Sequence, residues 1–174
     1  HPVVETPHLD QLARGGTRFT QAYTAVPSCI AARASLFTGM APKHHGRVGY
    51  CDGILFDYPH YLAGELAAAG YHTQCVGKMH VSPARNLCGF HNVILHDGYL
   101  HHERKIARNY ELVDDYMPWL RARRGADADI ILHGLNSNAW VARPWHYDED
   151  LHPTTWAVTM TIDCLRRRDP TKPF

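Results

Sequence analysis

Apolar and polar residues repeat with two different periods along the chain, and these periods predict its helices and strands. Apolar residues three or four apart, bounded by proline or glycine, predict helices over residues 7–15, 31–37, 61–69, 109–124 and 154–168. Short runs rich in β-branched or aromatic residues predict strands over 17–24, 72–76 and 92–95. Loops are expected at 40–60 and 126–153. Alternation of strands with helices indicates an α/β fold, with a mostly parallel or mixed sheet flanked by helices.

Composition narrows the class of protein further. A chain of 174 residues that is 45% hydrophobic suits one domain or part of a larger one. The 18 Lys and Arg residues are offset by 17 Asp and Glu residues. No basic excess is present to neutralise phosphates, so we expect no nucleic-acid partner. No apolar run approaches the roughly 20 residues of a membrane helix, so we expect no membrane span.

The cysteines, the histidines and the chain ends add three further expectations. The five cysteines form no Cys-x-x-Cys pair, which predicts neither a disulfide framework nor a structural zinc site. Both a cytoplasmic and a periplasmic or exported location stay open. The histidine pairs at 44–45 and 101–102 are interpreted as surface residues. A start at His1 without Met and an end at Phe174 suggest part of a longer protein.

The segment around Cys29 carries the strongest chemical signal. Cys29 falls at or just before a predicted helix N-terminus, where free N–H groups and the helix dipole favour negative charge. Arg33 is four residues on and would share its helix face. The pair predicts an anion pocket beside a thiol. On this local pattern alone, a buried cysteine beside a surface arginine is the alternative.

A family resemblance rests on three ordered motifs. The run from Cys29 to Arg33 reads Cys-x-Ala-x-Arg and continues into Leu36-Phe37-Thr38-Gly39, and Gly77-Lys78-Met79-His80 follows downstream. Together with the lead-in at 6–13 and 18–23, they resemble the formylglycine-dependent (type I) sulfatases of the alkaline phosphatase superfamily. The resemblance covers at least residues 6–80. It implies that 1–174 is a partial, N-terminal sulfatase catalytic domain with an alkaline-phosphatase-like fold, lacking its first strand and its C-terminal part.

The resemblance also implies a mechanism. A maturation enzyme would oxidise Cys29 to formylglycine (3-oxoalanine). The hydrated aldehyde would attack a sulfate monoester, such as an aryl sulfate or a sulfated carbohydrate, and would then release sulfate by re-forming the aldehyde. Arg33 would orient the diol, Lys78 would bind a sulfate oxygen, and His80 would assist proton transfer.

A divalent cation is implied as well, calcium first and magnesium as the alternative. Cys29, as formylglycine, would be one ligand, and the other ligands are expected outside this chain. Asp114 and Asp115 fall inside the predicted helix 109–124 and are interpreted as a solvated helix face. Without the other metal ligands, we expect the 174 residues alone to be inactive.

The substrate pocket and the exact reaction stay open at this stage. Trp140, Arg143 and His152, within the segment 136–152, are candidates to stack on a sugar or meet an acidic group, with loop packing as the alternative. A phosphonate or phosphate ester hydrolase of the same superfamily is a rival, because sulfur and phosphorus esters share tetrahedral geometry. A non-catalytic binding or structural module with unmodified Cys29 is a rival of another class.

Overall fold

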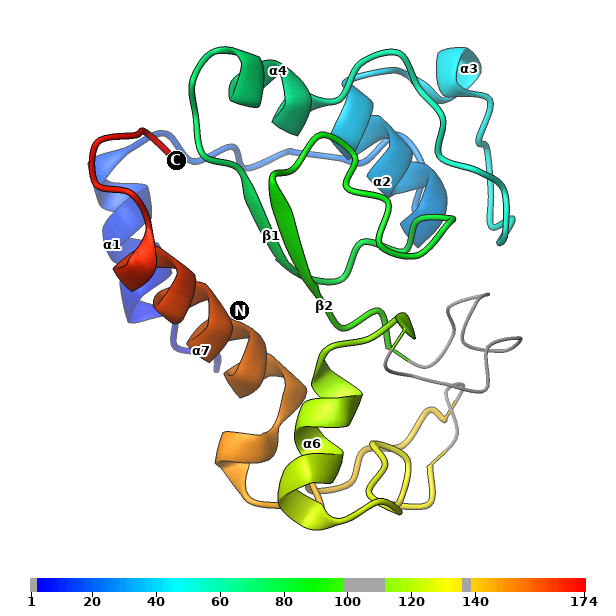
Figure 1. Ribbon diagram of the computed structural model, residues 1–174, viewed down its shortest axis with the longest axis vertical. Helices are drawn as coiled ribbons and strands as arrows, with labels where there is room; N and C mark the ends of the chain where they lie inside the picture. The colour runs from blue at the N-terminus through cyan, green and yellow to red at the C-terminus, as the bar shows by residue number, and fades with distance from the viewer. Residues whose placement is uncertain (1–2, 99–111, 136–138) are drawn as a thin grey trace.

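A two-stranded parallel sheet lies at the centre of the computed structural model, which describes residues 3–98, 112–135 and 139–174. Strands β1 (Gln74–Gly77) and β2 (Asn92–Leu95) pair in register from Gln74 opposite Asn92 to Gly77 opposite Leu95. Figure 1 shows helices on both sides of this sheet. They are α2 (Cys29–Thr38) and α4 (Leu62–Ala68) on one side, and α6 (Tyr116–Arg124) and α7 (Pro153–Arg167) on the other.

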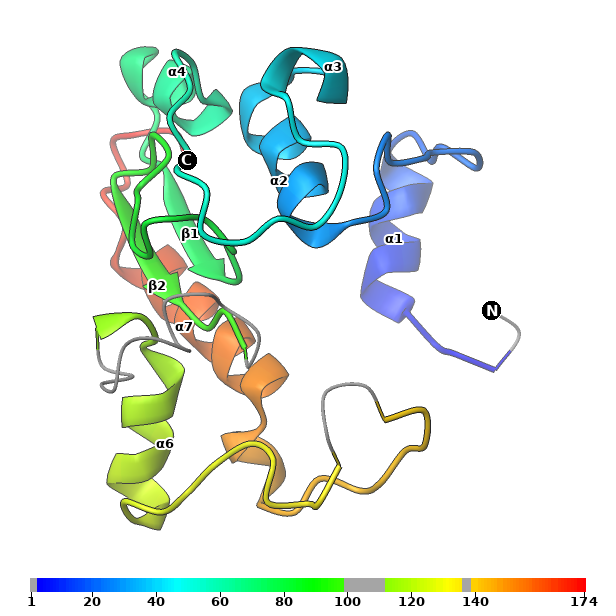
Figure 2. The same cartoon turned by 90° about the vertical axis from the view of Figure 1, so that its right-hand side faces the viewer.

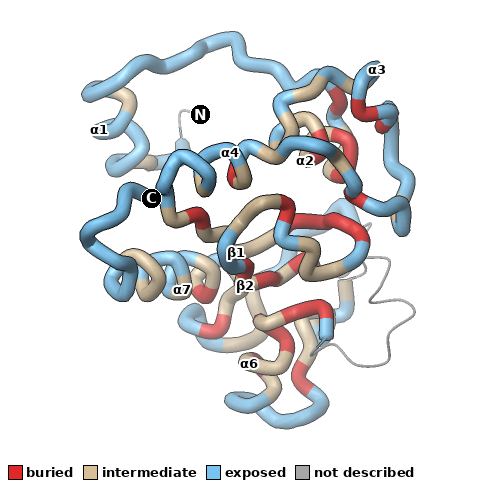
Figure 3. The backbone as a smooth tube through the Cα atoms, turned by 45° about the horizontal axis from the view of Figure 1, so that its top comes forward, coloured by how far each residue is buried: buried red, intermediate tan, exposed pale blue. Residues whose placement is uncertain are grey.

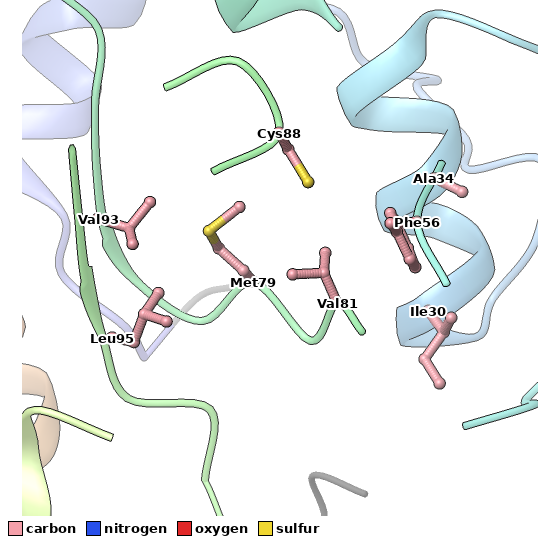
Figure 4. Close-up of a cluster of buried hydrophobic side chains, with 8 residues drawn as sticks. All are labelled: Ile30, Ala34, Phe56, Met79, Val81, Cys88, Val93 and Leu95. Atoms are coloured by element: carbon pink, nitrogen blue, oxygen red, sulfur yellow. The ribbon is translucent and has the colours of Figure 1, made fainter. Parts of the chain in front are cut away.

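The alternation of side chains along β2 creates two cores. Val93 and Leu95 point to the α2 side, where they join the cluster drawn in Figure 4, which also contains Ile30, Ala34, Phe56, Met79, Val81 and Cys88. Ile94 points the other way and packs against a second cluster, formed by Tyr116, Met117, Leu120, Ala128, Leu151 and Trp156. Full burial of each large apolar side chain contributes roughly 1.5–3 kcal/mol. The first cluster therefore fixes α2 against the end of the sheet.

Most of the predicted elements are confirmed, with small shifts at their ends. The helices predicted over 7–15, 31–37, 61–69 and 154–168 are α1 (Pro7–Gly15), α2, α4 and α7, and the strands predicted over 72–76 and 92–95 are β1 and β2. The predicted loops contain only two short additions, α3 (Pro42–His45) and the 3-10 helix η2 (Glu149–Leu151), within the described residues.

The strand predicted over residues 17–24 is wrong. No strand forms there, and Phe19 and Tyr23 are 79% and 86% exposed. The threonines and aromatics of this segment have high β propensity, but that propensity reflects packing against a neighbouring strand and a buried face. Neither is provided by the described residues around 17–24, so the segment stays irregular, with a turn at residues 20–21.

The interpretation of Asp114 and Asp115 as a solvated helix face is also wrong. Residues 109–111 lie outside the described residues, and α6 begins only at Tyr116, so both carboxylates precede the helix. Asp114 is 3% exposed, lies 2.9 Å from His96 Nδ1, and accepts the Met117 N–H at 2.7 Å. Carboxylates at a helix N-terminus are stabilised by the free N–H groups there.

Asp115 serves the same junction. Its carboxylate pairs with Arg85 at 2.7 Å and accepts the Leu95 N–H at 2.6 Å. The two aspartates therefore join the start of α6 to the end of β2, and the periodicity of the sequence did not reveal that role.

Helix α1 lies apart from both cores. Figure 2 shows it separated from the sheet, and Figure 3 shows it as exposed along nearly its whole length. None of its residues is buried, and Leu9 and Leu12 face solvent. No helix in the described part of the chain is long and apolar enough to cross a membrane.

A close backbone contact between Gly89 and α4 yields a stability test. Gly89 has φ +85, and a Cβ there would lie 2.3 Å from Gly64 N and 2.7 Å from Gly64 Cα. Because backbone atoms must move to relieve this overlap, we expect Gly89→Ala to lower the free energy of unfolding by about 2–4 kcal/mol in urea titrations. Gly70→Ala is the control, since Gly70 has φ +94 but open space around it, and about 1 kcal/mol is expected. Equal losses would contradict the close approach.

Candidate active site

Cys29 is the first residue of α2. Ser28 precedes it in an extended conformation, and the alanine-rich run that follows favours a helix. The helix ends at Gly39, which adopts φ 71 and donates its N–H to Ser35 O. The half-buried thiol of Cys29 therefore lies at a helix N-terminus, where unpaired N–H groups favour a negative charge.

The opposite end of α2 is held by a buried histidine. His45 Nδ1 accepts the Arg47 N–H at 3.1 Å, so the ring proton lies on Nε2, which donates to Ser35 Oγ at 2.8 Å. Burial lowers the pKa of His45, and the nearby charge of Arg47 lowers it further. The interpretation of the pair 44–45 as surface residues is thus wrong for His45, while the pair 101–102 lies outside the described residues.

Arg33 connects α2 to the segment that follows β1. Its guanidinium donates a short hydrogen bond to the backbone carbonyl of Lys78. Arg33 is half-buried, one helical turn beyond Cys29, so its charge lies on the side of α2 that faces the end of the sheet. Lys78 is half-buried as well, directly after the last residue of β1.

The backbone after β1 is held by a carboxylate from the neighbouring strand. Asp97, two residues beyond β2, accepts the Met79 N–H at 2.6 Å and the His80 N–H at 2.9 Å through one oxygen. Residues 77 and 80 have positive φ, so the chain turns sharply here. The carboxyl ends of parallel strands lie at one edge of a sheet, which is why a residue after β2 reaches the turn after β1.

This turn directs His80 to Cys29. His80 is almost fully buried, and its Nδ1 lies 3.2 Å from Cys29 Sγ. A ring nitrogen at that distance is placed to hold or transfer a proton at the sulfur position. Cys29, Arg33, His80 and the backbone of Lys78 therefore meet at one end of the sheet.

Tyr50 and Asp52 cover the other side of the His80 ring. Asp52 Oδ1 lies 3.8 Å from His80 Nε2, and the Tyr50 hydroxyl donates to Asp52 Oδ2 at 3.0 Å. Partial burial, the bond to Asp52 and the negative charges of Asp52 and a Cys29 thiolate raise the pKa of Tyr50 to about 12. The hydroxyl is therefore protonated at neutral pH and remains a donor.

Asp97, Tyr50 and Asp52 are site residues that were not expected from the sequence. Asp97 carried a usable signal, because a polar residue just past a predicted parallel strand lies at the edge where sites form. Tyr50 and Asp52 come from the long loop 40–60, where no periodicity indicates which side chains turn inward.

The three substrate-binding candidates are not brought to Cys29. Trp140 is 96% exposed, Arg143 donates to His133 O at 2.8 Å, and His152 caps α7 by accepting the Thr154 N–H at 3.1 Å. Figures 1 and 2 both place the segment 139–152 at the opposite end of the molecule from α2. Residues 136–138 lie outside the described residues.

A cavity of about 1050 Å³ opens between α2, α4, β1 and α7. Its lining is mostly apolar and includes Leu62, Leu66 and Phe90. None of Cys29, Arg33, Lys78 and His80 lines it, so it is distinct from the candidate site.

The described residues do not form a complete metal site. In residues 3–98, 112–135 and 139–174, no three His, Cys, Asp or Glu side chains gather to hold an ion. Asp114 and Asp115 are engaged at the start of α6, and Asp97 binds two backbone N–H groups. All five cysteines lie in the described residues and are free thiols.

Comparison with known sequences identifies relatives over all or part of this chain. The sulfatase family model matches residues 1–160. An arylsulfatase of Clostridium perfringens is 58% identical over 175 aligned residues, which cover 98% of this chain and 36% of that protein. Human arylsulfatase A is 42% identical over 89 residues, which cover 47% of this chain and 17% of that protein. This chain thus spans about a third of the length of the Clostridium relative.

Comparison with solved structures shows the same fold. A phosphonate monoester hydrolase of Silicibacter pomeroyi superposes with a TM-score of 0.70 at 20% identity, over 98% of this chain and 35% of that chain. The phosphonate monoester hydrolase of Agrobacterium radiobacter gives a TM-score of 0.69 at 22% identity, over 100% and 35% of the two chains. The arrangement of helices around the small parallel sheet is therefore part of an alkaline-phosphatase-like α/β fold.

Proposed function

The chain belongs to the sulfatase family, and on that premise we propose that the protein is a sulfuric ester hydrolase with its nucleophile made from Cys29. The 3.2 Å contact between Cys29 Sγ and His80 Nδ1 is the main support, because residue 29 then has a proton acceptor beside it at a helix N-terminus. Residues 1–174 would be the N-terminal part of the catalytic domain, in keeping with the shared length.

Maturation of Cys29 to formylglycine would supply an aldehyde hydrate able to attack sulfur and later release sulfate. Two residues beside position 29 suit that chemistry. Arg33, fixed by its bond to Lys78 O, would keep a permanent positive charge and several donors beside residue 29. His80 Nδ1 would take or return a proton at that position.

Lys78 would supply the second positive charge. It follows β1 at the edge of the sheet where ligands gather, and Asp97 holds the adjacent backbone. A positioned ammonium group would bind a sulfate oxygen and stabilise the negative charge that develops as the ester bond breaks.

We place the remaining metal ligands outside this chain. The described residues do not gather enough oxygen ligands for calcium or magnesium, whereas the relatives extend well beyond the matched region. Residue 29, after maturation, is the only metal ligand proposed in these 174 residues. A maturation enzyme that reads the segment from Cys29 to Arg33 would be the required protein partner.

Aryl sulfates and sulfated carbohydrates are the proposed substrates. The Clostridium relative is named an arylsulfatase, and an N-acetylgalactosamine-6-O-sulfatase of Bacteroides thetaiotaomicron is 38% identical over 82 residues. The phosphonate monoester hydrolases resemble this chain at the level of the fold. Parallel assays of an aryl sulfate and an aryl phosphonate therefore separate the two reactions.

The first functional test concerns Cys29. In the full-length protein produced with a maturation enzyme, mass spectrometry of the peptide that contains Cys29 should show the loss that converts a thiol to an aldehyde. Cys29→Ala should abolish hydrolysis of an aryl sulfate, because no nucleophile remains at the start of α2. Cys51→Ala, which removes an exposed thiol, is the control and should retain activity. An active Cys29→Ala variant would rule out the proposed nucleophile.

The second functional test concerns Lys78. Lys78→Ala should reduce kcat/KM for an aryl sulfate by the equivalent of about 2–4 kcal/mol, the effect of losing one preorganised donor. Lys43→Ala removes an exposed lysine from α3 and should change kcat/KM little. If the kcat/KM of both variants equals that of the unmodified protein, Lys78 does not contact the reacting group.

The third functional test uses the 174 residues alone. After maturation, and with calcium or magnesium added, this chain should not hydrolyse an aryl sulfate at a measurable rate, because the remaining metal ligands are proposed to lie outside it and its described residues gather no metal site. The full-length protein assayed beside it is the control. Comparable turnover by the two proteins would place the metal site within these residues.

A further inference from the structure

The Asp52 carboxylate lies on the opposite side of the His80 imidazole ring from Cys29, the proposed nucleophile. Its Oδ1 lies 3.8 Å from His80 Nε2, while Nδ1 of the same ring lies 3.2 Å from Cys29 Sγ. The side chain of Asp52 is only 13% exposed, so water screens its charge weakly. Any anion bound at residue 29 therefore experiences this negative charge.

The carboxylate is fixed in position. The Tyr50 hydroxyl donates to Oδ2 at 3.0 Å, and the Gly53 N–H donates to Oδ1 at 3.1 Å. The Tyr50 ring also packs on the His80 ring, with centroids 5.9 Å apart at 64°. The two hydrogen bonds hold the Asp52 carboxylate, which carries a negative charge at neutral pH, in one orientation.

The charges of the site decide which anions it tolerates. Arg33 and Lys78 contribute positive charge, as would the divalent cation proposed at residue 29, and Asp52 and Asp97 contribute negative charge close to the same turn. A sulfate monoester carries one negative charge. A phosphate monoester, with a second pKa of about 6, carries nearly two at neutral pH. The Asp52 carboxylate therefore repels a phosphate monoester, with its second negative charge, more strongly than it repels a sulfate monoester.

We propose that Asp52 is a specificity-determining residue that selects singly charged esters and rejects phosphate monoesters. The inference rests on the proposed function, since it assigns the charge class of the ester that residue 29 attacks. Sulfate monoesters satisfy this selection, and so do phosphonate monoesters and phosphate diesters, which also carry one negative charge. Asp52 acts through space on the bound anion, and it transfers no proton in this assignment.

The expected size of the effect follows from Coulomb's law. At separations of roughly 6–8 Å and an effective dielectric constant of about 20, one unit of charge changes a relative rate by at most about 30–100-fold. Screening by dissolved salt lowers this expectation to about tenfold. Comparison of two esters in the same site, with and without the Asp52 charge, isolates this contribution from the other charges.

A kinetic experiment on the full-length, matured protein tests the selection. The measured quantity is the activity toward para-nitrophenyl phosphate divided by the activity toward para-nitrophenyl sulfate, each expressed as kcat/KM. We expect Asp52→Asn to raise this ratio by about tenfold, because the negative charge is lost while the shape of the side chain is kept. The amide oxygen can still accept the Gly53 N–H, and the amide nitrogen can donate to the Tyr50 hydroxyl oxygen. Asp57→Asn, an exposed carboxylate of the same loop, is the matched control and should leave the ratio unchanged. An unchanged ratio in Asp52→Asn, with sulfate turnover retained, would overturn the inference and leave the proposed function intact.

A second experiment needs no turnover. In full-length protein whose Cys29 is kept as a thiol, the thiolate attacks iodoacetamide or iodoacetate, the S–C bond forms and iodide leaves. Both reagents react with the same thiolate, but iodoacetate is negatively charged and iodoacetamide is neutral. The ratio of their alkylation rates at Cys29 therefore reports the electrostatic potential at that residue and does not depend on how much thiolate is present. Asp52→Asn should raise the iodoacetate to iodoacetamide ratio by about threefold to tenfold, and Asp57→Asn should not.

The outcomes separate the inference from the proposed function. An unchanged alkylation ratio, in a variant whose circular dichroism and thermal unfolding match those of the unmodified protein, would overturn the role of Asp52. If the matured protein with Asp52 intact does not hydrolyse an aryl sulfate, but Asp52→Asn still shifts the alkylation ratio, the proposed function is overturned. The effect of the Asp52 charge on residue 29 would then stand.

Discussion

The link between α2 and the turn after β1 is the constraint on which the site depends. Two contacts form it, one from Cys29 Sγ to His80 Nδ1 and one from the Arg33 guanidinium to the Lys78 carbonyl. Packing of α2 on the first core supports the link from below, and Asp97 holds the turn from β2. Cys29 and His80 are 51 positions apart in the sequence. Without the packing of α2 on the first core and the hydrogen bonds of Asp97, nothing would offset the entropy cost of bringing them into contact.

The electrostatics of the site follow from the same arrangement. In the proposed function, the N-terminus of α2, Arg33 and Lys78 would attract an anion to residue 29, whereas the carboxylates of Asp52 and Asp97 would oppose a second negative charge on that anion. A site that attracts one charge and opposes a second is suited to a sulfate monoester. Covalent attack at residue 29 would divide one difficult displacement at sulfur into two easier steps.

The sequence predicted local structure well where the signal was local. The alanine-rich run after Cys29 and the apolar run 92–95 led to α2 and β2 because helix propensity and strand periodicity are properties of neighbouring residues. The meeting of Cys29 with His80 could be anticipated only through the family motifs. Burial depends on residues distant in sequence, so the strand at 17–24 and the exposure of Asp114 were predicted wrongly, and Asp52 was missed.

The most direct measurement is a trapping experiment with the full-length Cys29→Ser protein, whose serine is verified by mass spectrometry. A serine oxygen can form a bond to sulfur and expel the aryl alcohol, but it lacks the second hydroxyl needed to re-form an aldehyde and release sulfate. We therefore predict one equivalent of para-nitrophenol per protein from para-nitrophenyl sulfate, with a stable sulfate ester on residue 29. Sustained turnover by this variant, or a sulfate ester on a different residue, would contradict a covalent nucleophile at the start of α2.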